Sequence, residues 1–116
     1  INAGGMYSPV DLETGKIACA ACDKQRIVYE RHPRTGCVLK GYQIPFWDET
    51  MALCREAAYK VPQMGYVGWD VAITADGPLF IEANNLPGHD AFPQMPLQAP
   101  DKIGILPVFQ KYIKGL

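Results

Sequence analysis

Long apolar runs are missing from this 116-residue sequence. A helix that crosses a membrane needs about 20 consecutive apolar residues, whereas the longest apolar stretches here, such as residues 17–22, have the length of a strand. The first residues also lack the charged and apolar segments that make up a signal peptide. We therefore expect no membrane partner, and a location in the cytoplasm.

A charge excess of either sign is missing as well. The sequence has 11 basic and 12 acidic side chains, which gives a net charge of -1. A protein that binds nucleic acid electrostatically carries a basic excess or a clustered basic face, so we expect no nucleic-acid partner.

Cysteine is scarce too. The sequence has four, which are too few for a disulfide scaffold, and we expect reduced thiols: Cys19, Cys22, Cys37 and Cys54.

What is present is the composition of an ordinary globular protein, with 48% hydrophobic and 20% charged residues. The length fits a single domain, residues 1–116. The first third alternates strand-like runs with tight turns, one of which ends at Gly15, a residue that can adopt a positive φ. Strands this close in sequence pair antiparallel. The sequence therefore predicts an antiparallel meander, with strands at residues 6–11, 16–22, 27–30 and 37–39.

A helix and a hairpin follow the meander. Apolar residues recur at helical spacing over residues 48–60, and Asp48 is a favourable N-cap. Two β-rich runs, residues 67–74 and 79–84, flank turn-forming residues and predict a hairpin. A second short helix is predicted over residues 106–114. The predicted fold class is therefore α+β, an antiparallel β-sheet with one or two packed helices.

The register of the predicted hairpin decides which side chains lie together. Directly paired residues share a face of a sheet, and neighbours along a strand alternate between faces. A two-residue turn at Asp76-Gly77 would pair Val71 with Glu82 and bury a charge among apolar partners. A three-residue turn, Asp76–Pro78, avoids this cost and pairs Asp70 with Asn84 and Ala72 with Glu82. It also spares the proline a ladder hydrogen bond that it could not donate. We therefore expect Asp70, Glu82 and Asn84 on one face. The other face would then carry five apolar residues: Trp69, Val71, Ile73, Leu79 and Ile81.

Two carboxylates and an amide oxygen on one face point to a hard cation. The carboxylates repel each other unless a cation lies between them, and Mg²⁺ prefers oxygen ligands, takes one or two carboxylates and completes its octahedron with water and phosphate oxygens. The pattern therefore predicts part of a metal-phosphate site at Asp70, Glu82 and Asn84. The alternative interpretation is an exposed hairpin face whose acids are simply solvated.

These residues carry a resemblance to a known family. An Asp followed by Glu-x-Asn on antiparallel strands, with Asn-Leu-Pro-Gly just after, resembles the ATP-grasp ligases. More narrowly, the chain resembles the sugar-transfer-associated ATP-grasp branch, often labelled alpha-L-glutamate ligase-related. Four further motifs in the same order support this: residues 7–15 (YSPVDLETG), 32–36 (HPRTG), 44–48 (IPFWD) and 68–73 (GWDVAI).

The resemblance implies the C-terminal portion of an ATP-grasp domain, without its upstream half. It implies ATP-dependent ligation, in which a carboxylate is phosphorylated to an acylphosphate that an amine then attacks. Asp70, Glu82 and Asn84 match the family's Mg²⁺ (or Mn²⁺) ligands and would also contact the nucleotide, as would Asn2, which precedes paired glycines. The full-length protein would bind a nucleotide and a small carboxylate or amine substrate. This chain alone is expected to be inactive, and the expected assembly is a homodimer.

Other residues allow competing interpretations. Cys19, Cys22, His32 and Cys37 could form a zinc module, which would make the chain a non-catalytic binding or structural domain. Cys19 and Cys22 are an odd number of residues apart, so a regular strand would direct them to opposite faces.

Two other positions bear on the site. His89-Asp90 could face a substrate, although such a loop pair is more often solvated. Many relatives carry an Arg two residues before the first metal carboxylate, where this chain has Gly68.

Overall fold

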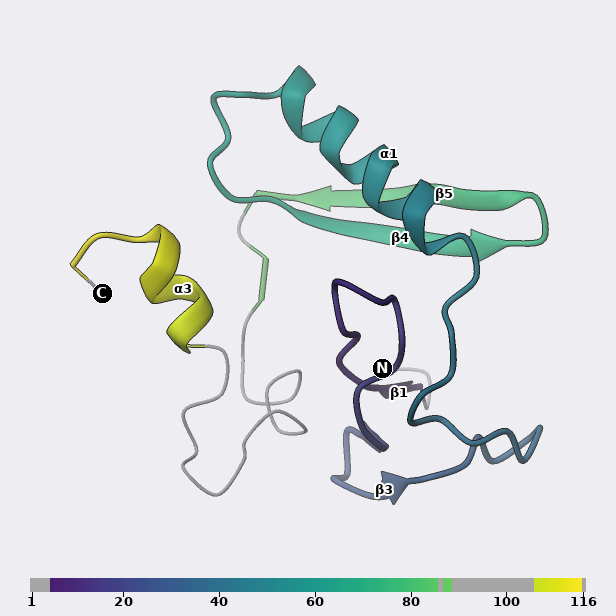
Figure 1. Cartoon of the computed structure of the whole chain (residues 1–116). Helices are drawn as coiled ribbons and strands as arrows, with labels where there is room; N and C mark the ends of the chain where they lie inside the picture. The colour runs from purple at the N-terminus through teal and green to yellow at the C-terminus, as the bar shows by residue number, and fades with distance from the viewer. Residues whose placement is uncertain (1–4, 86, 89–105, 116) are drawn as a thin grey trace. The chain divides into compact units, whose positions relative to one another are not determined.

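The computed structural model describes residues 5–85, 87–88 and 106–115 (Figure 1). It is α+β, with two small antiparallel sheets and a few helices, so the predicted fold class is confirmed. The chain divides into two compact units, of which one is Gln43–Gly88 and the other contains the described residues on either side of it. Within the described residues, no helix is both long enough and apolar enough to cross a membrane.

The unit that begins before Gln43, called the first unit below, contains the predicted meander; Gln43–Gly88 is the second unit. Its strands β1 (Met6–Tyr7), β2 (Ala21–Asp23) and β3 (Val28–Tyr29) pair antiparallel in the order β1-β2-β3. Isolated bridges, Val10 with Ile17 and Arg31 with Val38, extend the pattern. The strands are shorter than predicted, although backbone hydrogen bonds such as that from the Ala18 N–H to the Pro9 carbonyl, at 2.9 Å, continue the pairing beyond them. Helix α3 (Leu106–Tyr112) begins where the sequence predicts and ends two residues earlier.

Asp11 organises the first turn of this unit. Its Oδ1 accepts hydrogen bonds from the N–H of Thr14 at 2.8 Å, the hydroxyl of Thr14 at 2.9 Å and the N–H of Glu13 at 3.1 Å. The bonds from Thr14 lower the pKa of Asp11. The turn ends at Gly15 with φ +69°, the left-handed conformation that the sequence predicts.

Asp23 has the same role between β2 and β3, but its carboxylate is buried. Oδ1 accepts from the N–H groups of Gln25 and Ile27, both at 2.9 Å, and Oδ2 accepts from the hydroxyl of Tyr29 at 2.9 Å. Burial is the largest influence and favours a higher pKa, but the hydrogen bonds together lower the pKa of Asp23 below its ordinary value. One carboxylate therefore holds the turn that allows Arg26 a positive φ of 69°.

The second unit contains α1 (Trp47–Lys60), β4 (Gly68–Thr74) and β5 (Gly77–Asn84). The helix is confirmed, but Asp48 is not its N-cap: the cap is Phe46, which has φ 55° and makes no side-chain capping bond. The Thr50 hydroxyl instead donates to the Phe46 carbonyl at 2.8 Å. Asp48 lies within the first turn, where a negative charge is favourable beside the positive end of the helix dipole.

The turn between β4 and β5 is shorter than predicted. Thr74 pairs with Gly77, so two residues form the turn, and the predicted three-residue turn is wrong. The Thr74 hydroxyl donates to the Gly77 carbonyl at 2.8 Å, and Gly77 has φ +125°. Alternation along the ladder makes the next pair, Ile73 with Pro78, a non-hydrogen-bonded one. Pro78 therefore does not have to donate. The observed turn residues are Ala75 and Asp76, a two-residue turn that differs from the rejected turn at Asp76-Gly77.

A β-bulge shifts the register farther along the hairpin. Val71 pairs with Phe80, but Asp70 pairs with Glu82, so Ile81 remains as one extra residue in β5. A bulge of this kind changes which face the following residues occupy, because side chains alternate with period 2.

One face of the hairpin packs against α1, as Figure 1 shows. Trp69 and Phe80 belong to that face, with ring centroids 5.2 Å apart. Leu79 pairs with Ala72 on the opposite face and is 56% exposed, and the bulge residue Ile81 is 65% exposed. The prediction that Leu79 and Ile81 join the apolar face is therefore wrong, because it rests on the wrong register.

The Asp23 carboxylate is expected to stabilise the first unit. Asp23→Asn should lower the thermal unfolding temperature at neutral pH by several degrees, because it removes the charge and one acceptor oxygen of a buried side chain that holds the turn. Since the folded pKa is lowered, this stabilisation is present above the unfolded pKa of 3.8 and is lost as pH falls through the folded value. Melting curves of the two proteins from pH 7 to pH 3 should therefore converge. Asp76→Asn, at an exposed carboxylate, is the control, and a constant difference across this range would contradict the assignment.

Candidate functional site

Two carboxylates lie opposite each other on neighbouring strands. Asp70 of β4 and Glu82 of β5 are a direct cross-strand pair, and both are exposed. Asn84 follows Glu82 by two residues, pairs with Gly68 and is half-buried. The predicted pairing of Asp70 with Asn84 is therefore wrong. In the observed register, the pleat directs the side chains of Asp70, Glu82 and Asn84 to the same face.

The bulge is the reason that these carboxylates share a face. If the ladder continued without it from the turn, Asp70 would pair with Ile81, and Glu82 would pair with Trp69. The two acids would then lie on opposite faces, with Glu82 directed toward α1. The single extra residue reverses this alternation for the last part of β5.

The arrangement favours a positively charged ligand. Cβ atoms of directly opposite residues are about 4.5–5.5 Å apart, and like charges at such positions are destabilising. A cation between the carboxylates removes that cost. Two carboxylates and an amide oxygen suit Mg²⁺ or Mn²⁺, hard cations that are usually completed by water and phosphate oxygens. This donor set fits a divalent cation held together with an anionic ligand.

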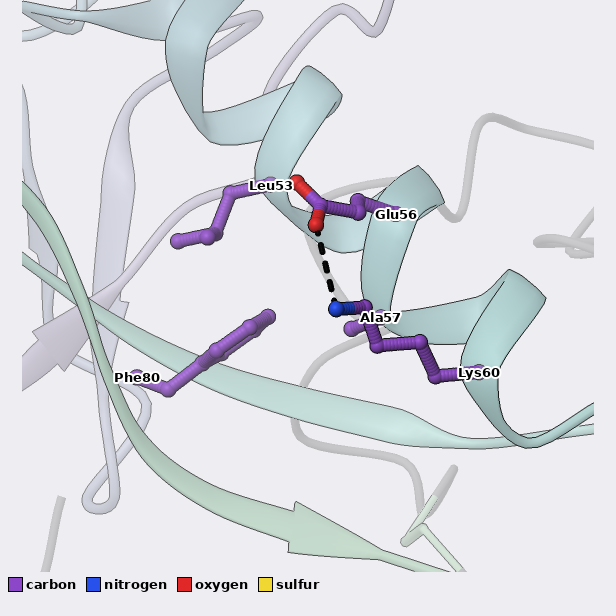
Figure 2. Close-up of a pocket in the computed structure, with 5 residues that line it drawn as sticks. All are labelled: Leu53, Glu56, Ala57, Lys60 and Phe80. Carbon is purple, nitrogen blue, oxygen red and sulfur yellow. Dashed lines mark ion pairs between the residues drawn. The ribbon is translucent and has the colours of Figure 1, made fainter.

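A hollow lies on the other side of the hairpin, between α1 and β5. It has a volume of about 210 Å³ and is lined by Leu53, Glu56, Ala57, Lys60 and Phe80. Figure 2 shows Phe80 directed toward the helix, with Lys60 and Glu56 joined by an ion pair. Their charged atoms are 3.3 Å apart and their side chains are mostly exposed. The charges of this hollow neutralise each other, and its position separates it from the carboxylates.

The zinc alternative is not supported. Across residues 5–85, 87–88 and 106–115, no three His, Cys, Asp or Glu side chains are placed to share a metal ion. No disulfide joins the four cysteines: Cys22 is buried, Cys19 and Cys54 are half-buried and Cys37 is exposed. Burial raises the pKa of Cys54, which disfavours a reactive thiolate there.

His32 has a structural contact that sequence reasoning missed. Its Nδ1 accepts hydrogen bonds from the N–H groups of Arg34 and Thr35, both at 3.3 Å, in the turn formed by residues 32–36. The sequence signal for this turn is a His followed directly by Pro, with a Gly at the end of the turn. Gly36 has φ +70°, a conformation that favours glycine. The other two predicted positions, Asn2 and the pair His89-Asp90, lie outside the described residues.

Comparison with known proteins adds one finding to this geometry. A family model described as sugar-transfer associated ATP-grasp matches residues 1–110, nearly the whole chain. No curated protein and no solved structure gave a significant match. The matched region contains both strands of the carboxylate pair. The chain therefore belongs to the sugar-transfer associated ATP-grasp family.

Proposed function

We propose that this chain supplies the cation- and phosphate-binding part of an ATP-dependent, ligase-like active site. Family membership supports ATP binding and a ligase-like activity at a coarse level. The observation that carries the proposal is the direct pairing of Asp70 with Glu82 on the hairpin face opposite α1. Asn84 provides the third oxygen, and Mg²⁺ or Mn²⁺ is the cation that this donor set fits.

Each residue has a simple role in this proposal. Asp70 and Glu82 bind the cation through carboxylate oxygens, and the carboxamide oxygen of Asn84 completes the protein's share of the ligands. The bound ion would neutralise charge on the nucleotide phosphates during phosphoryl transfer. The three side chains therefore contribute by positioning and electrostatics, and none of them transfers a proton.

The finer proposal concerns the reaction. The γ-phosphoryl group of ATP would pass to a substrate carboxylate, giving ADP and an acylphosphate, and attack by an amine would then form an amide and release inorganic phosphate. This is carboxylate-amine ligation of the alpha-L-glutamate ligase-related kind. We place this chain in the C-terminal portion of the ATP-grasp domain, with Asn2 near the nucleotide, and propose a cytoplasmic protein, inactive as this fragment, that can form a homodimer.

Binding of Mn²⁺ tests the cation site directly. Adding Mn²⁺ to isotope-labelled protein should broaden the NMR signals of Asp70, Glu82 and Asn84 first, and ADP should strengthen the effect. Asp70→Asn should abolish this pattern, because a neutral amide replaces one of two carboxylate ligands. Asp76→Asn, which changes an exposed acid at the tip of the same hairpin, is the matched control. Equal broadening in Asp70→Asn and the parent protein would overturn the proposal.

The Asp70–Glu82 pair also predicts that Glu82→Gln changes stability in opposite directions, relative to the parent protein, without and with a divalent cation. Without divalent cations, Glu82→Gln should stabilise the hairpin by up to about 1 kcal/mol, because it removes like charges at directly opposite positions. In the presence of Mn²⁺ the parent protein should gain stability through binding to the folded form, and Glu82→Gln should not. Thermal melts in EDTA and in Mn²⁺ measure both effects, with Glu30→Gln as the control. Stabilisation of Glu82→Gln by Mn²⁺ to the parent's extent would contradict this prediction.

A further inference from the structure

Gly68 lies at the start of β4 with no space for a side chain. A Cβ atom added there would be 2.5 Å from Cβ of Pro87, 3.3 Å from its Cγ and 3.6 Å from its Cα. A proline ring is bonded to its own backbone at both ends, so it cannot turn away as a flexible side chain would. Gly68 does not have a positive φ. Position 68 therefore requires a glycine because of the close packing of Pro87, and not because of its backbone conformation.

This contact belongs to the face that carries the carboxylates. Gly68 precedes Asp70 by two residues on a regular part of β4, so a Cβ at position 68 would point to the same face as Asp70. Gly68 is also the direct partner of Asn84, the last residue of β5. Pro87 therefore packs over the end of β4 on the face shared with Asn84, and the chain after β5 turns back across the hairpin.

We propose that the contact between Gly68 and Pro87 positions Asn84 as a cation ligand. Asn84 ends its strand, so no further ladder pair restrains it on that side. The packing of Pro87 on Gly68 provides that restraint three residues later. Mg²⁺ demands near-ideal octahedral geometry, so a ligand at a strand end needs such support. This inference rests on the proposed cation site and adds two positioning residues to it.

Mn²⁺ affinity measured by EPR of the free aquo ion tests the inference. Gly68→Ala should reduce the affinity about tenfold, within the usual range for loss of a group that orients a metal ligand. Gly65→Ala is the matched control, because a Cβ there meets no atom within 4 Å and its φ is not positive. In NMR spectra with a small fraction of one equivalent of Mn²⁺, the signals of Asp70 and Glu82 should broaden in Gly68→Ala as in the parent protein, whereas the broadening of the Asn84 side-chain amide should weaken because the ion lies farther from it.

A double-mutant cycle tests whether Gly68 and Pro87 act through the same contact. Pro87→Gly also removes the contact and introduces no clash, so it should lose a similar factor in affinity even if Gly68→Ala unfolds. In the Pro87→Gly background, Gly68→Ala should have no further effect, because the two residues act through one contact. Additive losses would overturn the inference.

The outcomes distinguish this inference from the proposed function. If the parent protein and Asp70→Asn bind Mn²⁺ alike, the cation site itself is wrong and both proposals fail. If Asp70→Asn abolishes binding while Gly68→Ala and Pro87→Gly bind as tightly as Gly65→Ala, only the positioning role is overturned.

Discussion

The alternation of side chains in the β4–β5 hairpin is the constraint on which the candidate site depends. One face of the hairpin packs against α1, so the register decides for every residue whether its side chain points toward the helix or to the opposite face. The bulge at Ile81 changes that assignment once and brings Glu82 opposite Asp70. Two like charges are thereby placed side by side, a cost that is understandable if the face binds a cation.

The described parts of the molecule are held together more by backbone pairing and turns than by a large core. Their buried apolar residues are Ala21, Cys22 and Leu39. The turns of the first unit instead depend on side-chain acceptors, namely the carboxylates of Asp11 and Asp23. In the second unit, Pro87 packs closely on Gly68 after the end of β5. Small changes at such positions are therefore expected to have local and specific effects.

Some expectations from sequence were wrong for identifiable reasons. Asp48 has a good N-cap side chain, but the N-cap lies two residues earlier, at Phe46, and the Thr50 hydroxyl donates to the Phe46 carbonyl. The register prediction treated the hairpin as a regular ladder, and no local signal in the sequence marks the bulge. The zinc interpretation relied on cysteine spacing, which contains no information on whether distant segments meet. The spacing of residues along the chain likewise contains no information on the close packing of Pro87 against Gly68.

The sequence by itself determined the α+β class, the antiparallel meander, the helix after it, the hairpin and the family resemblance, because periodicity, turn residues and ordered motifs are local properties of the chain. It also identified Asp70, Glu82 and Asn84 as the residues of interest. Only the tertiary structure decided the pairing of Asp70 with Glu82, the face on which they lie and the contact of Pro87 with Gly68. Each of these would change if the strand pairing shifted by one residue. The pairing depends on packing against α1 and on the bulge, and neither can be read from local sequence.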